Sequence, residues 1–210
     1  VTIAEVYAGP TDPLAEELTG SALVQLLSGV VSIFAVCSMA VSWHRFILRD
    51  ELGRGLRLDG NVMRYAGNTI LIMLVMVLTS LFLAVAVVHT PAAVAVAVPS
   101  FVLLGGVITR LSVKLPAVAL GNRNFSFRDA WAASEGNFWP CVGVFLLNSA
   151  IILAGFLLLV MIGGALDQVN SALGQFVETA GSIVLQLFYA FFNAAVLTSL
   201  YGYFVERRDF

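Results

Sequence analysis

The chain has 210 residues, of which 60% are hydrophobic and only 11% are charged, and its formal net charge is -2. Soluble domains carry about 25% charged residues, so this chain has too little polar surface to cover a water-soluble globule. The composition therefore excludes an ordinary soluble domain and indicates an integral membrane protein.

Five apolar segments predict membrane-spanning helices. They run over residues 21–43, 67–88, 92–111, 139–163 and 181–204. About 20 apolar residues cross the hydrocarbon core as a helix, and these segments alternate too little for barrel strands. The predicted fold is all-α, a polytopic transmembrane bundle of five spans forming one membrane domain over residues 1–210. Pro99 predicts a kink in the third span, because it removes a backbone donor.

All eleven basic residues fall on one side of these spans. They are Arg45, Arg49, Arg54, Arg57 and Arg64 after the first span, Arg110, Lys114, Arg123 and Arg128 after the third, and Arg207 and Arg208 after the fifth. The positive-inside rule therefore predicts cytoplasmic loops over residues 44–66 and 112–138 and a cytoplasmic C-terminus. Residues 1–20, which carry four acidic groups and no basic one, are expected outside.

Two connections between the spans have recognisable local signals. The outer link of His89, Thr90 and Pro91 predicts a tight antiparallel hairpin. In the second cytoplasmic loop, Ser126 and Asp129 resemble a capping box, and Gly136 follows as a C-terminal stop. We expect a short helix near 127–135, lying along the membrane interface or packed on the protein. Its predicted apolar face holds Phe127, Ala130, Trp131 and Ser134.

Aromatic, small and amide side chains predict how the spans are placed and packed. Trp43, Trp131 and Trp139 are expected to mark the interface. Asn148 and Asn193 lie within spans and are interpreted as interhelical hydrogen-bond partners. Small residues such as Gly105, Gly106 and Gly155 allow close helix approach by the same logic.

We find no motif that indicates enzyme chemistry. H-E-x-x-H, G-x-S-x-G and paired intramembrane carboxylates are absent from the sequence. The two cysteines, Cys37 and Cys141, form no C-x-x-C pair, so neither a metal site nor a disulfide framework is indicated. A lone His44 at the end of the first span favours an interfacial histidine over a proton relay or a ligand. We therefore expect no enzyme activity, no cofactor and no nucleic-acid partner.

The basic residues of the loops are candidates for contact with lipid headgroups or a partner. They are Arg45, Arg49, Arg54, Arg57, Arg110, Lys114, Arg123 and Arg128. Each basic group near an anionic leaflet contributes about 1 kcal/mol. The alternative is that these residues only fix the topology of the chain and make no specific contact.

Several stretches together resemble an uncharacterised family of polytopic inner-membrane proteins of proteobacteria. They are SWHRF at 42–46, LPAVAL at 115–120, FRDAW at 127–131, EGN at 135–137 and LYGYFVERR at 200–208. The family is similar in plan to the membrane domain attached to some glycerophosphodiester phosphodiesterases. The resemblance implies a bacterial inner membrane, and it supplies no catalytic residues. Members of the family usually begin with another apolar helix, which is here either missing or placed before Val1.

These observations predict a non-enzymatic membrane protein that serves as an accessory or assembly subunit of a larger inner-membrane complex. Its expected partners are the bilayer, anionic headgroups and other membrane subunits. The alternative is a lipid-handling or small-molecule transport protein, with a path lined by the kinked third span and the polar positions of the fourth and fifth spans.

Overall fold

The structure of the chain, a computed structural model, describes residues 13–51 and 59–208. This part is built from helices: α1 (Pro13–Arg49), α2 (Gly60–His89), the 3-10 turn η2 (Pro91–Ala93), α3 (Val94–Ser112), α4 (Lys114–Ala119), α5 (Phe127–Ala133), α6 (Phe138–Asp167) and α7 (Ser171–Phe204). Five stretches are long and apolar enough to cross a membrane, the third formed by α3 and α4 together. The all-α fold with five spans is therefore confirmed, and the chain is a multi-pass membrane protein.

The first and last helices are longer than their apolar segments. With 34 residues and a rise of 1.5 Å per residue, α7 is about 51 Å long, whereas the hydrocarbon core is about 30 Å thick. Helical hydrogen bonding continues after the apolar run ends, because charged residues such as Arg45 and Arg49 tolerate a helix as well as a loop. The sequence-based boundaries at residues 43 and 181 were therefore too short for these two helices.

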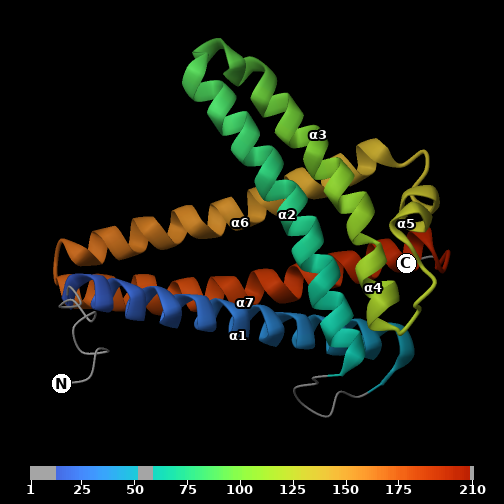
Figure 1. The fold of residues 1–210 in the computed structure, drawn as a ribbon, viewed down its shortest axis with the longest axis horizontal. Helices are drawn as coiled ribbons and strands as arrows, with labels where there is room; N and C mark the ends of the chain where they lie inside the picture. Colours follow the sequence, from blue (N-terminus) through green and yellow to red (C-terminus); the bar gives the residue numbers. More distant parts are fainter. Residues whose placement is uncertain (1–12, 52–58, 209–210) are drawn as a thin grey trace, which may run out of the picture.

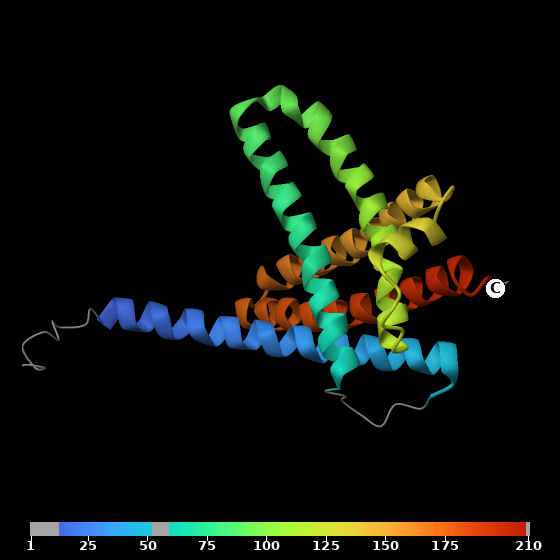
Figure 2. The ribbon, with the colours of Figure 1, turned by 45° about the vertical axis from the view of Figure 1, so that its right-hand side comes forward.

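The helices form two arms that meet at one end (Figures 1 and 2). In the first arm, α7 packs on both α1 and α6. The second arm is the α2–α3 hairpin, which leans away from the first arm in both views. The short helices α4 and α5, the start of α2, the end of α1 and the C-terminal segment all gather where the arms meet. We call this the basic end, because the described arginines and Lys114 lie on or next to these segments.

The hydrophobic core lies at the basic end and not along the arms. Its main cluster joins α1, α2, α4 and α7 through residues that include Val41, Val62, Ala119 and Leu197. By contrast, no residue between 73 and 89 or between 94 and 104 is buried. The α2–α3 hairpin is therefore fixed at its base and exposes apolar side chains along the rest of its length.

Glycine allows the close contact between α3 and α6. A methyl group on Gly105 would overlap the ring of Phe145, and one on Gly106 would overlap the side chain of Val142. In the same way, Gly155 leaves room for Leu185 of α7. The expectation that small residues bring the spans together is confirmed at these three positions.

The two connections with local signals fold as expected. Helix α2 ends at His89, Thr90 caps it, and η2 leads directly into α3, which makes the tight hairpin. Helix α5 has a complete capping box, in which Ser126 Oγ accepts from the Asp129 N–H at 3.2 Å and Asp129 Oδ2 accepts from the Ser126 N–H at 2.7 Å. Gly136, with φ +80°, follows the helix as a stop.

Helix α4 was not predicted from the sequence. It lies within residues 112–138, which were expected to be a loop, and residues 115–120 are all buried. It is separated from α3 at Val113, because Pro116 has no N–H to donate to the carbonyl four residues earlier. This buried turn forms part of the core that joins the two arms.

Candidate functional site

A fully buried polar network joins the two arms at the basic end. His44 of α1 has no exposed surface. Its Nδ1 lies 2.8 Å from Thr198 Oγ1 of α7, and its Nε2 lies 3.2 Å from the Tyr65 hydroxyl of α2. The interpretation of His44 as an interfacial side chain is therefore wrong, because both ring nitrogens have partners inside the protein.

The surrounding bonds determine which nitrogen of His44 carries the proton. The Thr198 hydroxyl donates its hydrogen to the carbonyl of Ala194 at 2.7 Å, so Oγ1 accepts from His44. His44 is then protonated at Nδ1, and Nε2 accepts from the Tyr65 hydroxyl. All three side chains have hydrogen-bond partners within the protein and need no water. The network therefore acts as a structural cross-link between the three helices.

Arg110 holds α5 against the end of α3. Its side chain is buried, with Nε donating to Ser134 Oγ at 2.8 Å and a terminal nitrogen donating to the Trp131 carbonyl at 2.7 Å. The guanidinium carbon also lies 3.7 Å from the centroid of the Trp131 ring, a cation–π contact. Helix α5 therefore packs on the protein, and its position along the membrane interface stays a prediction.

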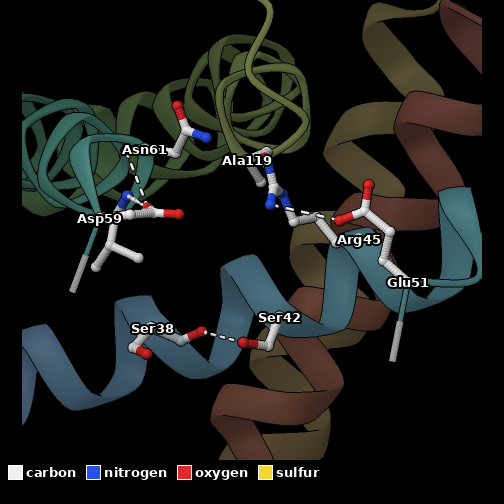
Figure 3. A network of polar contacts seen from close by, with 8 residues as sticks. Ser38, Ser42, Arg45, Glu51, Asp59, Asn61 and Ala119 are labelled. Atoms are coloured by element: carbon white, nitrogen blue, oxygen red, sulfur yellow. Dashed lines mark hydrogen bonds and ion pairs between the residues drawn. The ribbon is translucent and has the colours of Figure 1, made fainter. Parts of the chain in front are cut away.

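Arg45 connects α1 to the end of α4. Figure 3 shows its side chain between the two helices, donating from Nε to the Ala119 carbonyl at 2.8 Å and pairing with Glu51 at 3.4 Å. The carbonyls at a helix C-terminus carry partial negative charge, so a cation is favourable there. At the start of α2, Asp59 caps the helix by accepting from the N–H groups of Asn61 and Val62.

A polar pocket opens beside these contacts, between α2, α4 and the segment that follows α4. Its volume is about 270 Å³, and its polar lining side chains are Asn61, Arg64, Asn68, Lys114, Asn122 and Arg123. This group is called the basic pocket below. It brings together three cationic and three amide side chains, and none of the described residues that line it is acidic. The N–H groups of these side chains can donate hydrogen bonds to an anion. The six side chains include no nucleophile–base pair of the kind that a catalytic site would need.

The eight basic candidates from the sequence lie in different environments. Arg45 and Arg110 make bonds within the protein, whereas Lys114 and Arg123 line the basic pocket. Arg49 and Arg128 are exposed outside it. Arg54 and Arg57 lie outside the described residues.

The predicted interface anchors also differ from one another. Trp131 is 43% exposed and Trp139 is 70% exposed, so both rings are available to the surroundings of the protein. Trp43 instead packs edge-on against Phe191 of α7, with ring centroids 5.8 Å apart, and its indole nitrogen is buried without a partner.

The two span asparagines lie on the α6–α7 pair. Asn148 of α6 faces α7 across a groove of about 400 Å³, where Phe192 and Ser199 also contribute to the lining. Its Oδ1 is buried and accepts no hydrogen bond. Asn193 is half-buried on α7. The interpretation of these residues as interhelical hydrogen-bond partners stays a prediction.

Other candidate chemistry is sparse in the part of the chain that the structure describes. Within that part, no group of three or more His, Cys, Asp or Glu side chains lies close enough to hold a metal ion. Cys37 and Cys141 are buried free thiols on different helices. The grooves between α6 and α7 and between α2 and α3 are lined mainly by apolar side chains.

No family model matches the chain, and no curated protein or solved structure matches it either. The resemblance to proteobacterial inner-membrane proteins stays a prediction.

Sequence reasoning found Lys114 and Arg123 but missed the rest of the basic pocket. Arg64 is one of the basic residues that predict the orientation but is not among the eight contact candidates, and no role is predicted from the sequence for the amides of Asn61, Asn68 and Asn122. The spacing of 61, 64 and 68 places these residues on one face of α2, since positions three and four apart are neighbours on a helix. That periodicity was the available signal. The sequence did not indicate that this face of α2 meets α4, because α4 itself was not predicted.

Proposed function

We propose that this chain is a non-enzymatic accessory or assembly subunit of a larger membrane complex. The observation that carries the proposal is the exposed length of the α2–α3 hairpin, where none of residues 73–89 or 94–104 is buried. Helices in a bilayer associate through close packing and interhelical hydrogen bonds. Along most of this length the two helices expose apolar side chains, and Phe101 makes one contact with the first arm, against Phe145 of α6. Further membrane helices would complete the packing.

The first arm supports the same role. Large apolar side chains on its outer surfaces are highly exposed, such as Met161 of α6 at 72% and Phe176 of α7 at 68%. Two diverging arms that share one rigid base present apolar surface on several sides. This is a suitable shape for a subunit that holds neighbouring membrane proteins together.

The alternative function is the handling of a lipid or the transport of a small molecule. It would require a polar path into the middle of the membrane. The α6–α7 grooves do contain polar groups, but most of their lining is apolar; the polar side chains are Asn148, Ser182, Gln186, Tyr189, Ser199 and Tyr203. We prefer the accessory role because these few polar groups lie among apolar side chains and make no continuous path.

The proposed location is the bacterial inner membrane, with residue 1 outside and the C-terminus in the cytoplasm. The bias of the basic residues toward one end supports this orientation. The basic pocket and α5 would then face the cytoplasm.

The accessory role is tested by extracting a C-terminally tagged chain from native membranes in a mild detergent and measuring its mass by native sizing. The expected result is a defined assembly that contains other membrane polypeptides. Phe82→Ala on α2 and Met161→Ala on α6 should weaken that assembly, because each trims an exposed arm side chain. Arg128→Gln on α5 is the control and should leave the assembly unchanged. A lone monomer under every mild condition would refute the proposal.

A further inference from the structure

The basic pocket concentrates positive charge from three parts of the chain. Arg64 lies on α2, Lys114 begins α4, and Arg123 follows α4. Within the described residues, neither the Arg64 nor the Arg123 guanidinium makes an ion pair or a hydrogen bond. Lys114 Nζ lies 3.9 Å from the centroid of the Phe127 ring, so this cation contacts an aromatic face and not a carboxylate. Like charges that are brought together without an acid favour the binding of an anion.

The nearby acidic group is already engaged. Asp59 lies two residues before Asn61, but its carboxylate accepts from the first N–H groups of α2 at 3.0 Å each. It is therefore oriented toward its own helix, and it does not line the pocket. The charge in the pocket remains uncompensated by the described residues that line it.

The amide groups and the backbone shape a cavity around this charge. Figure 3 shows the Asn61 amide on the side of α2 that faces the end of α4. Gly121, with φ +83°, closes α4, and a Cβ on it would lie 3.7 Å from Asn61 Nδ2. The cavity of about 270 Å³ has space for a phosphate and its neighbouring atoms, at roughly 30 Å³ for each water-sized group. Guanidinium and amide N–H groups are suitable donors to phosphate oxygens.

The position of the pocket indicates the source of the phosphate. Arg64 and Asn68 lie in the first three turns of one span, and Lys114 lies in the last part of another. Exposed apolar residues, Leu71 and Val75, continue the same face of α2 beyond Asn68. A ligand with a phosphate at the pocket and hydrocarbon alongside the span matches this order of polar and apolar surface.

We propose that the basic pocket binds the phosphate of an anionic phospholipid headgroup. This site is independent of the accessory role, since its residues lie at the shared base and not on the exposed lengths of the arms. A soluble phosphate compound has the same donor requirements, so the experiment must distinguish the two sources.

The test uses the purified full-length chain in a neutral detergent and measures bound lipid by native mass spectrometry. The probes are phosphatidylglycerol and, as the neutral headgroup, phosphatidylcholine. Inorganic phosphate and glycerol 3-phosphate are added as soluble competitors. The expected result is binding of phosphatidylglycerol in preference to phosphatidylcholine, with little displacement by the soluble phosphates.

Two matched variants remove the same charge from different places. Arg64→Gln with Arg123→Gln changes the pocket, and Arg49→Gln with Arg128→Gln changes exposed arginines outside it. The pocket pair should weaken phosphatidylglycerol binding by about tenfold for each guanidinium removed. The outside pair should retain the affinity of the original chain. If the pocket pair lowers the melting temperature, Arg64→Lys with Arg123→Lys should restore it and most of the binding.

Three results would overturn the proposal. Equal loss of binding in both variant pairs would mean a diffuse charge attraction and no defined site. Equal binding of phosphatidylcholine would exclude recognition of an anionic headgroup. Full displacement of phosphatidylglycerol by glycerol 3-phosphate or inorganic phosphate would assign the pocket to a soluble anion.

Discussion

His44 connects α1 to α7 through Thr198 and to α2 through Tyr65. These three helices belong to both arms, so the network joins the arms where they meet. Buried polar groups are costly when they are unpaired, and a satisfied network defines one arrangement of its helices. We infer that His44 selects the relative position of the arms as well as stabilising them.

Thr198→Val tests this network with little change of shape. The substitution removes Oγ1, so the buried Nδ1–H of His44 loses its acceptor. An unsatisfied buried donor costs about 1–3 kcal/mol, and we expect a clearly lower melting temperature in detergent. The control is Ser199→Ala at the adjacent exposed position. Equal melting temperatures for the two variants would contradict the role of the network.

Asp129 makes the start of α5 sensitive to pH. The backbone N–H of Ser126 and then its hydroxyl donate to this carboxylate, which holds the pKa of Asp129 below its usual range. A folded pKa below the unfolded value of about 3.9 stabilises the ionised folded state. This contribution is complete above the unfolded pKa and is lost as the pH falls through the folded pKa.

Asp129→Ala should therefore lower stability at neutral pH but not in acid. The expected difference in melting temperature from the original chain is measurable at about pH 6 and disappears below the folded pKa, since both chains then lack the carboxylate. Glu135→Ala, at an exposed position with no capping role, serves as the control. A difference that persists unchanged into acid would show that Asp129 acts by something other than its charge.

Between elements, the contact of α3 with α6 depends on glycine. Gly105→Ala places a methyl group against the ring of Phe145, and overpacking of this kind typically costs about 1–3 kcal/mol. We expect a lower melting temperature, with Phe145→Leu in the same chain recovering part of the loss. Gly143→Ala on α6 has open space around it and should be neutral or slightly stabilising. Similar destabilisation in both alanine variants would indicate a helix effect unrelated to the contact.

The elements differ in how well the sequence predicted them. The five spans, the hairpin at His89 and the capping box of α5 were predicted correctly, because hydropathy and local hydrogen bonding determine them. Helix α4 was missed because six residues containing Pro116 have no helical periodicity of sufficient length. The environment of His44 was missed because its partners, 21 and 154 residues away along the chain, are placed by tertiary packing.

For the whole molecule, the sequence predicts which segments span the membrane but not how the spans lean against one another. Hydropathy marks α2 and α3 as apolar enough to cross a membrane, but it does not show that the hairpin diverges from α1 and α7. The close contact of α3 with α6 depends on the fit of Gly105 and Gly106 against their neighbours. The basic pocket was only partly predictable for the same reason, since it exists where α2 and α4 meet.

The orientation of the whole molecule provides the last prediction. The long helices run from the basic end to the tips of the two arms, one at the α2–α3 turn with Thr90 and the other at the α6–α7 turn with Gln168 (Figure 1). If the positive-inside rule holds, the basic end is cytoplasmic. Single cysteines introduced as Thr90→Cys or Gln168→Cys should react with a membrane-impermeant maleimide added to spheroplasts, whereas Arg128→Cys and Glu135→Cys should react only after lysis. All four positions are exposed, and the native thiols of Cys37 and Cys141 are buried, so the unmodified chain supplies the background. Labelling of Arg128→Cys in intact spheroplasts would reverse the orientation and would place the basic pocket outside.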